Sequence, residues 1–209
     1  MDNQNSNSID SEERPWLSWI CDSQSTDELK SKYDSWAKNY DADVRESWKF
    51  ILDNVAAILE KNLSQRTVKI LDAGAGTGLL GEILFKLGYT NIFAVDLSAK
   101  MLEVAASKKV YNSLEQVNLE DNVAVKRLGR FDMVIATGLF AYAHAGVTIL
   151  KNLFESIESR GLFVVTIRDD YYRELESAMN SLSWQLIEQK QLPIYDGQQN
   201  MNFLAFQKL

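Results

Sequence analysis

The chain has 209 residues, a length suited to one domain, and its 46% hydrophobic and 24% charged residues indicate a folded protein rather than a disordered one. Its 29 acidic and 22 basic side chains give a net charge of -7, which argues against nucleic acid as a partner. Cys21 is the single cysteine, so neither an internal disulfide nor a multi-cysteine metal site is expected. With no secretory pattern and no membrane-spanning apolar run, we expect a cytoplasmic protein without metal.

The N-terminal part divides into a polar segment and two predicted helices. Residues 1–24 are rich in Asn, Ser, Asp and Glu, so we expect a flexible tail before one domain over residues 25–209. Ser25 is a suitable cap for a first helix. Three aromatic residues then follow at spacings that place them on one helix face: Tyr33, Trp36 and Tyr40. A second helix with an apolar stripe completes residues 25–62.

Beyond Arg66 the chain alternates between short β-branched runs and helical stretches. This alternation is typical of a doubly wound α/β fold, in which helices cover both faces of a mostly parallel sheet. The predicted strands are residues 68–73, 91–96, 115–119, 131–137, 162–167, 184–191 and 200–207. The last two flank the turn-like Tyr195-Asp196-Gly197, so we expect them to form an antiparallel hairpin.

A glycine-rich segment, residues 72–78, follows the first predicted strand. It contains a dinucleotide-binding pattern, Gly76-Thr-Gly78-Leu-Leu-Gly81, which would place a pyrophosphate at a helix N-terminus. That pattern begins too far beyond the strand, however, and the carboxylate of Asp72 would oppose a pyrophosphate. A frame that starts at Asp72 instead offers a carboxylate to a cationic amino-acid group, such as that of S-adenosylmethionine.

Asp96 ends the second predicted strand, where a carboxylate can accept hydrogen bonds from both ribose hydroxyls of an adenosyl group. Both candidate cofactors share this requirement, and a helix cap is the alternative role for Asp96. Leu97 and Met101 follow and can pack against adenine. Asn118 and Leu119, at the end of the predicted third strand, can border the other side of the ring.

These residues resemble class I S-adenosylmethionine-dependent methyltransferases, and so does the segment Phe131-Asp-Met-Val-Ile. Residues 33–43, 138–144 and 165–168 resemble, more narrowly, the Williams-Beuren syndrome region methyltransferase-like proteins. The resemblance implies a Rossmann-like sheet of seven strands in the order 3-2-1-4-5-7-6, with strand seven antiparallel. It also implies lid helices at residues 25–62 and S-adenosylmethionine as the cofactor.

The resemblance further implies which residues form the cofactor site. These are Tyr33, Trp36, Tyr40, Asp72, Ala73, Gly74, Gly76, Gly78, Asp96, Leu97, Met101, Asn118, Leu119 and Thr137. The aromatic lid suits a positive sulfonium, because a cation–π contact is worth about 0.5–2 kcal/mol. An amphipathic helix that simply buries its aromatic face is the alternative.

The catalytic candidates follow the fourth strand, where a doubly wound sheet faces its ligand. His144 is the only histidine and our first candidate for a general base, with Tyr142 as the second. A pocket-lining role for His144 remains open, because a base is needed only for a hydroxyl or ammonium acceptor. Candidates for acceptor contacts are Tyr40, Phe140 and Arg168, although Arg168-Asp169-Asp170 can also simply begin a helix.

The sequence therefore predicts O- or N-methylation of a small molecule by a monomer or homodimer, without a nucleic-acid or membrane partner. The segment 137–142 lacks the signature of enzymes that methylate base amines, which argues further against nucleic acid. Two other functions stay open. One is an NAD(P)-dependent oxidoreductase that uses the later glycine frame, and the other is a catalytically silent binding protein with a methyltransferase fold.

Overall fold

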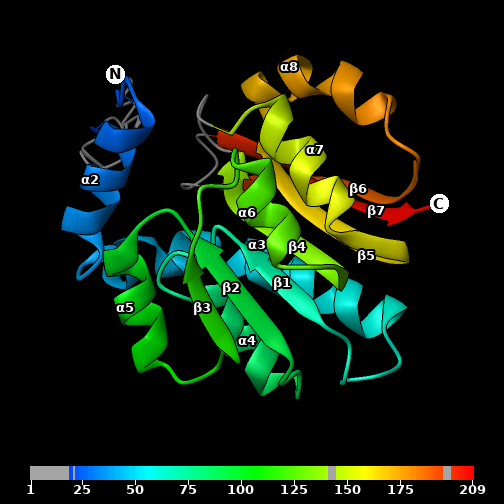
Figure 1. The fold of residues 1–209 in the computed structure, drawn as a ribbon, viewed down its shortest axis with the longest axis horizontal. Helices are drawn as coiled ribbons and strands as arrows, with labels where there is room; N and C mark the ends of the chain where they lie inside the picture. The colour runs from blue at the N-terminus through cyan, green and yellow to red at the C-terminus, as the bar shows by residue number, and fades with distance from the viewer. Residues whose placement is uncertain (1–18, 21, 141–144, 195–198) are drawn as a thin grey trace, which may run out of the picture.

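A seven-stranded sheet forms the centre of the protein, with helices on both faces (Figure 1). The computed structural model describes residues 19–20, 22–140, 145–194 and 199–209. The strands are β1 (Ile70–Ala73), β2 (Ile92–Asp96), β3 (Ser113–Gln116), β4 (Phe131–Phe140), β5 (Ile157–Arg168), β6 (Trp184–Ile194) and β7 (Gln199–Lys208). The helices are α2 (Thr26–Trp36), α3 (Tyr40–Asn62), α4 (Leu79–Lys86), α5 (Ala99–Ser107), α6 (Asn122–Arg127), α7 (Val147–Glu155) and α8 (Asp169–Asn180).

The strand order is β3-β2-β1-β4-β5-β7-β6, and β7 runs antiparallel to both β5 and β6. The other neighbouring strands pair in parallel. The doubly wound fold and its strand order are thus confirmed. The third strand begins at Ser113, earlier than predicted, and the predicted turn at residues 195–197 lies outside the described residues.

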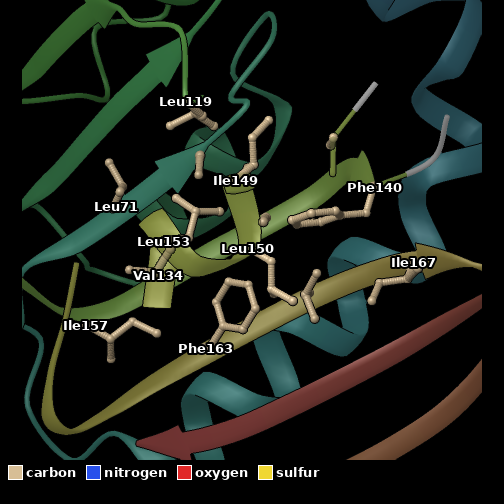
Figure 2. Close-up of a cluster of buried hydrophobic side chains, with 14 of the residues drawn as sticks. Leu71, Leu119, Val134, Phe140, Ile149, Leu150, Leu153, Ile157, Phe163 and Ile167 are labelled. Carbon is tan, nitrogen blue, oxygen red and sulfur yellow. The ribbon is translucent and has the colours of Figure 1, made fainter. Parts of the chain in front are cut away.

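Two apolar clusters fix the helices to the sheet. One cluster lies between the sheet and helices α3 and α4, and it includes Ile51, Leu84 and Met133. The other packs α6, α7 and α8 on the opposite face, where Leu153 and Phe163 lie among the fully buried side chains (Figure 2). The central strands are buried on both faces, which explains why they read as continuous apolar runs rather than as alternating ones. No helix in the described part of the chain is long and apolar enough to cross a bilayer.

The break between the first two helices differs from the prediction. Ser25 caps α2 as predicted, by accepting a hydrogen bond from the Glu28 N–H at 3.2 Å. The helix then ends at Trp36, and Tyr40 is the first residue of α3 rather than part of α2. The Asn39 N–H closes the turn on the Trp36 carbonyl at 2.9 Å. The predicted aromatic face therefore spans a helix–helix junction.

Candidate functional site

The glycine segment forms a tight loop between β1 and α4. Gly74, Gly76 and Gly78 all have positive φ, at 75°, 55° and 85°, where a side chain would be strained. The N–H groups of Gly74 and Ala75 both donate to the Val95 carbonyl, which ties the loop to β2. A Cβ added to Gly76 would meet no atom within 4 Å. The loop backbone is therefore open to a ligand at that point.

Asp96 lies at the end of β2, directly beside this loop. Its Oδ2 accepts a hydrogen bond from the Gly76 N–H at 2.8 Å, and its Oδ1 accepts one from the Ser98 N–H at 2.8 Å. Burial raises the pKa of Asp96, although these backbone hydrogen bonds act against the rise. Each carboxylate oxygen keeps a second lone pair, so both can still accept a hydrogen bond from a ligand hydroxyl.

Asp72 lies at the end of β1 and is buried. The phenol of Tyr111 donates to its Oδ2 at 2.7 Å. Burial raises the pKa of Asp72 to about 7, and the negative charge of Asp96 adds to the rise while the Tyr111 hydrogen bond opposes it. Burial also raises the pKa of Tyr111, so the phenol stays protonated and able to donate. Asp72 is therefore a carboxyl group that titrates near neutral pH.

A cavity opens over the loop, and we call it the main cavity. Of the predicted cofactor residues it is lined by Tyr33, Tyr40, Gly74, Gly76, Asp96, Leu97, Met101, Asn118, Leu119 and Thr137. A smaller cavity adjoins it, shares Tyr40 and Thr137, and reaches Asp72. Together the two cavities run along the carboxyl ends of the central strands, which is the usual ligand position in a doubly wound sheet.

The lid aromatics divide into two roles. Tyr33 and Tyr40 line the main cavity, whereas Trp36 is buried in the apolar cluster and lines neither cavity. The Trp36 ring stacks on Tyr33 at 6.2 Å and meets Tyr40 edge-on at 4.7 Å. Its indole N–H donates to Asp43 at 2.6 Å. The structure therefore places Trp36 behind the two tyrosines, not against a ligand.

Several other predicted residues lie away from the cavities. Ala73 and Phe140 are fully buried in the cluster below α7, so Phe140 has no surface to offer an acceptor (Figure 2). Gly78 caps α4 in a left-handed conformation and lines neither cavity. Arg168 pairs with Asp170, and α8 begins at Asp169, so this triplet starts a helix. Tyr142 and His144 lie outside the described residues.

Part of the lining was not predicted from the sequence. The additional residues of the main cavity are Thr26, Leu29, Val117, Glu120, Gly138, Leu139, Ala145 and Ile149. Tyr111 was not predicted either; its ring lies against Gly78, the N-cap of α4, and Gly81 in its first turn. Because these two glycines are three residues apart, the start of α4 has no side chains on one face. This face without side chains is the one sequence signal that a large side chain packs there.

A sheet of this order, with an acid at the ends of β1 and β2 around a glycine loop, defines the class I S-adenosylmethionine-dependent methyltransferase fold. The family model described as "Methyltransferase domain" matches residues 64–207, and the chain belongs to this family. Enzymes of this class take their methyl group from S-adenosylmethionine.

Curated relatives agree with this membership, and a solved structure shares the fold. The chain is 30% identical over 155 residues to a malonyl-[acyl-carrier protein] O-methyltransferase of Priestia megaterium, covering 71% of this chain and 54% of the relative. It is 26% identical to a ribosomal protein L11 methyltransferase of Thermotoga neapolitana, covering 59% and 46%. Magnesium protoporphyrin IX methyltransferase from Synechocystis, solved with bound S-adenosylmethionine, shares the fold with a TM-score of 0.68 at 14% identity, over 79% of this chain and 82% of that one. The chain thus spans about half the length of these two curated relatives.

The packing of Tyr111 on α4 generates a stability prediction. A glycine-to-alanine change inside a helix normally stabilises it by about 1 kcal/mol. At Gly81, however, the added Cβ would lie 2.8 Å from Cε2 of the Tyr111 ring. We therefore expect Gly81→Ala to lower the free energy of unfolding by about 1–3 kcal/mol in urea denaturation. In a Tyr111→Ala background the same change should be neutral or stabilising, and an equal loss in both backgrounds would contradict this packing.

Proposed function

We propose that the protein transfers a methyl group from S-adenosylmethionine to a small-molecule acceptor, at oxygen or nitrogen. The observation that carries the proposal is the position of Asp96, which lines the main cavity while its two oxygens also receive the Gly76 and Ser98 N–H groups. That arrangement fixes a carboxylate where an adenosyl ribose needs a two-point acceptor.

The chemistry of the cavity fits the whole cofactor in three parts. Leu97, Met101 and Leu119 give apolar contacts for an adenine ring. Asn118 uses its Oδ1 to accept the Glu120 N–H at 3.0 Å, which leaves its amide nitrogen to donate to the ring. Asp72, at the far end of the adjoining cavity, provides an anion for the ammonium group of the methionine part.

The same features disfavour a dinucleotide. A pyrophosphate needs free N–H groups and positive charge at the start of α4. Here the Gly76 N–H is already donated to Asp96, and Asp72 adds a second acid next to the loop. Two carboxylates at this position would repel a diphosphate and attract a cation.

S-Adenosylmethionine, when bound, supplies a methyl group on a positively charged sulfur, so that transfer is an in-line displacement with the C–S bond electrons returning to sulfur. The protein's task is then to hold both reactants in line and to exclude water. Tyr33 and Tyr40 do this from the lid, and their rings also suit the positive charge. We assign His144, with Tyr142 as the second candidate, the removal of the acceptor proton.

The acidic net charge of -7 supports a small acceptor over a nucleic acid. The relatives are named for different acceptors, an acyl carrier protein and a ribosomal protein among them, so protein acceptors belong in the test. The narrower family resemblance, the cytoplasmic location and the monomeric or homodimeric state stay predictions.

Removing the Asp96 carboxylate tests the cofactor site. Asp96→Ala should weaken the binding of S-adenosylhomocysteine at least about 100-fold, because two charge-assisted hydrogen bonds to the ribose are lost. Isothermal titration calorimetry measures this, with Glu103→Ala on the exposed side of α5 as the control. Wild-type affinity in Asp96→Ala, or tighter binding of NADH than of S-adenosylhomocysteine, would reject the assignment.

The raised pKa of Asp72 generates a pH prediction. Its carboxyl group titrates at about 7 in the free protein, whereas an ammonium ligand favours the charged form. Binding of S-adenosylhomocysteine should therefore release a proton below pH 7 and strengthen up to about tenfold per pH unit until the pH passes 7. Asp72→Asn should bind more weakly and lose this dependence. Calorimetry at pH 6 and pH 8 in buffers of different ionisation enthalpy measures the released proton, and a pH-independent wild type would contradict the prediction.

A methyl-transfer screen tests the acceptor class. Carboxylates, phenols, amines and intact acyl carrier protein would be incubated with S-adenosylmethionine, and the S-adenosylhomocysteine formed would be measured. We expect turnover with a small hydroxyl or amine compound, and His144→Ala should lower it by about 10²-fold or more because the proton acceptor is lost. Turnover with the protein acceptor alone would reject a small-molecule enzyme, and unchanged turnover in His144→Ala would reject the base.

A further inference from the structure

Two Tyr-Asp pairs, Tyr33-Asp34 and Tyr40-Asp41, lie on either side of the junction between α2 and α3. In each pair the tyrosine lines the main cavity. In each pair the aspartate instead accepts a hydrogen bond from a hydroxyl group next to the proposed cofactor site, Ser98 for Asp34 and Thr77 for Asp41. The two aspartates have no place in the proposed chemistry, and their contacts call for another role.

Asp34 attaches α2 to the start of α5. Its Oδ1 accepts hydrogen bonds from the Ser98 hydroxyl at 2.5 Å and from the Lys100 N–H at 3.2 Å. Ser98 is buried and also donates its backbone N–H to Asp96. Burial works against the charge of Asp34, but the hydrogen bonds from Ser98 and Lys30 outweigh it and lower the pKa. Asp34 is therefore an anion that shares Ser98 as a hydrogen-bond donor with Asp96, the proposed ribose acceptor.

Asp41 attaches the first turn of α3 to the glycine loop and to the end of α5. Its Oδ1 accepts a hydrogen bond from the hydroxyl of Thr77, a buried residue between Gly76 and Gly78. Its Oδ2 pairs with Lys108 at 2.7 Å. Lys108 is the C-cap of α5 and is itself well buried, with 11% of its side chain exposed.

The two aspartates thus hold opposite ends of the same helix. Ser98 is the N-cap of α5 and Lys108 its C-cap, and the nine residues between them span about 14 Å. Figure 1 shows α2 beside α5 at the edge of the domain. The aspartate that follows each tyrosine therefore ties the backbone next to that ring to the domain, in addition to the contacts of both rings with Trp36.

We propose that Asp34 and Asp41 are positioning residues that fasten the lid helices to α5 and the glycine loop, and that they control how fast the cofactor leaves. This inference rests on the proposed function, because it takes the main cavity as the cofactor site. We call the Asp34–Ser98 and Asp41–Thr77 contacts the two latches. Breaking either latch loosens Tyr33 or Tyr40 over the main cavity, while the contacts that Asp96 and the glycine loop make with the ligand remain.

The variants are chosen to separate the latches from general loss of stability. Asp34→Ala and Asp41→Ala each remove one latch. Thr77→Val removes the hydroxyl that donates to Asp41 and keeps the shape of the side chain, so it reports on the second latch without a lost charge. Asp53→Ala, on the exposed face of α3, the helix that also carries Asp41, is the matched control.

The first measurement is hydrogen exchange on the protein without ligand. In the Asp34 and Asp41 variants we expect faster exchange of amides 26–45 and unchanged exchange over residues 131–140 and in the Asp53→Ala control. An equal increase across the sheet, or none in the lid, would overturn the proposal. This arm does not depend on the identity of the cofactor.

The second measurement is the dissociation rate of S-adenosylhomocysteine by stopped flow. Each latch variant should raise the rate about tenfold, and Thr77→Val combined with Asp41→Ala should be no faster than Asp41→Ala alone, because both changes break the same Asp41–Thr77 latch. Rates within twofold of wild type would overturn the proposal. If the wild type itself does not bind S-adenosylhomocysteine, the proposed function fails, and the exchange experiment still decides whether the latches hold the lid.

Discussion

Two carboxylates at the ends of neighbouring parallel strands set the electrostatics on which the site depends. Asp72 receives a phenol hydrogen bond and Asp96 receives two backbone N–H groups, all from neutral donors. Burial and mutual repulsion raise the pKa of Asp72 to about 7, which is the cost of placing the pair there. A ligand that brings positive charge relieves this cost, whereas an anionic ligand increases it. The sign of the charge that the site accepts is therefore built into the strand ends.

The glycine loop makes that arrangement possible. β1 and α4 connect through a short loop that contains three glycines with positive φ, so the chain turns within a few residues and gives the Gly76 N–H to Asp96. Gly78 and Gly81 also leave room on α4 for the Tyr111 ring, whose phenol reaches Asp72. The glycines therefore serve two purposes: they let the backbone approach a ligand, and they leave space for Tyr111, which donates a hydrogen bond to the buried Asp72.

Local sequence patterns were sufficient to predict most of the fold and the central residues of the site. Asp72, Gly76 and Asp96 stand next to strands that the apolar runs mark clearly, so their meeting at one sheet edge follows from parallel pairing alone. Phe140 and Trp36 could not be placed this way. Phe140 follows the cavity residue Leu139, and Trp36 lies between Tyr33 and Tyr40 in the sequence, so only the packing of α7 and of the helix junction decides that they point into the core. Tyr111 depends on a contact between distant segments, which periodicity does not report.

The two lid helices are held to the domain by different forces. α3 buries a long apolar stripe, with Ile51, Val55 and Leu59 fully covered, so the core of the domain holds the body of this helix, while its first turn, which carries Tyr40, is also held by Asp41. The buried residues of α2 are Lys32 and Trp36, a much smaller apolar contribution. The position of α2 therefore depends more on directional hydrogen bonds such as Asp34 to Ser98. Such hydrogen bonds can be exchanged with water at a lower net cost than the exposure of an apolar stripe, so α2, which carries Tyr33, is the more adjustable of the two lid helices.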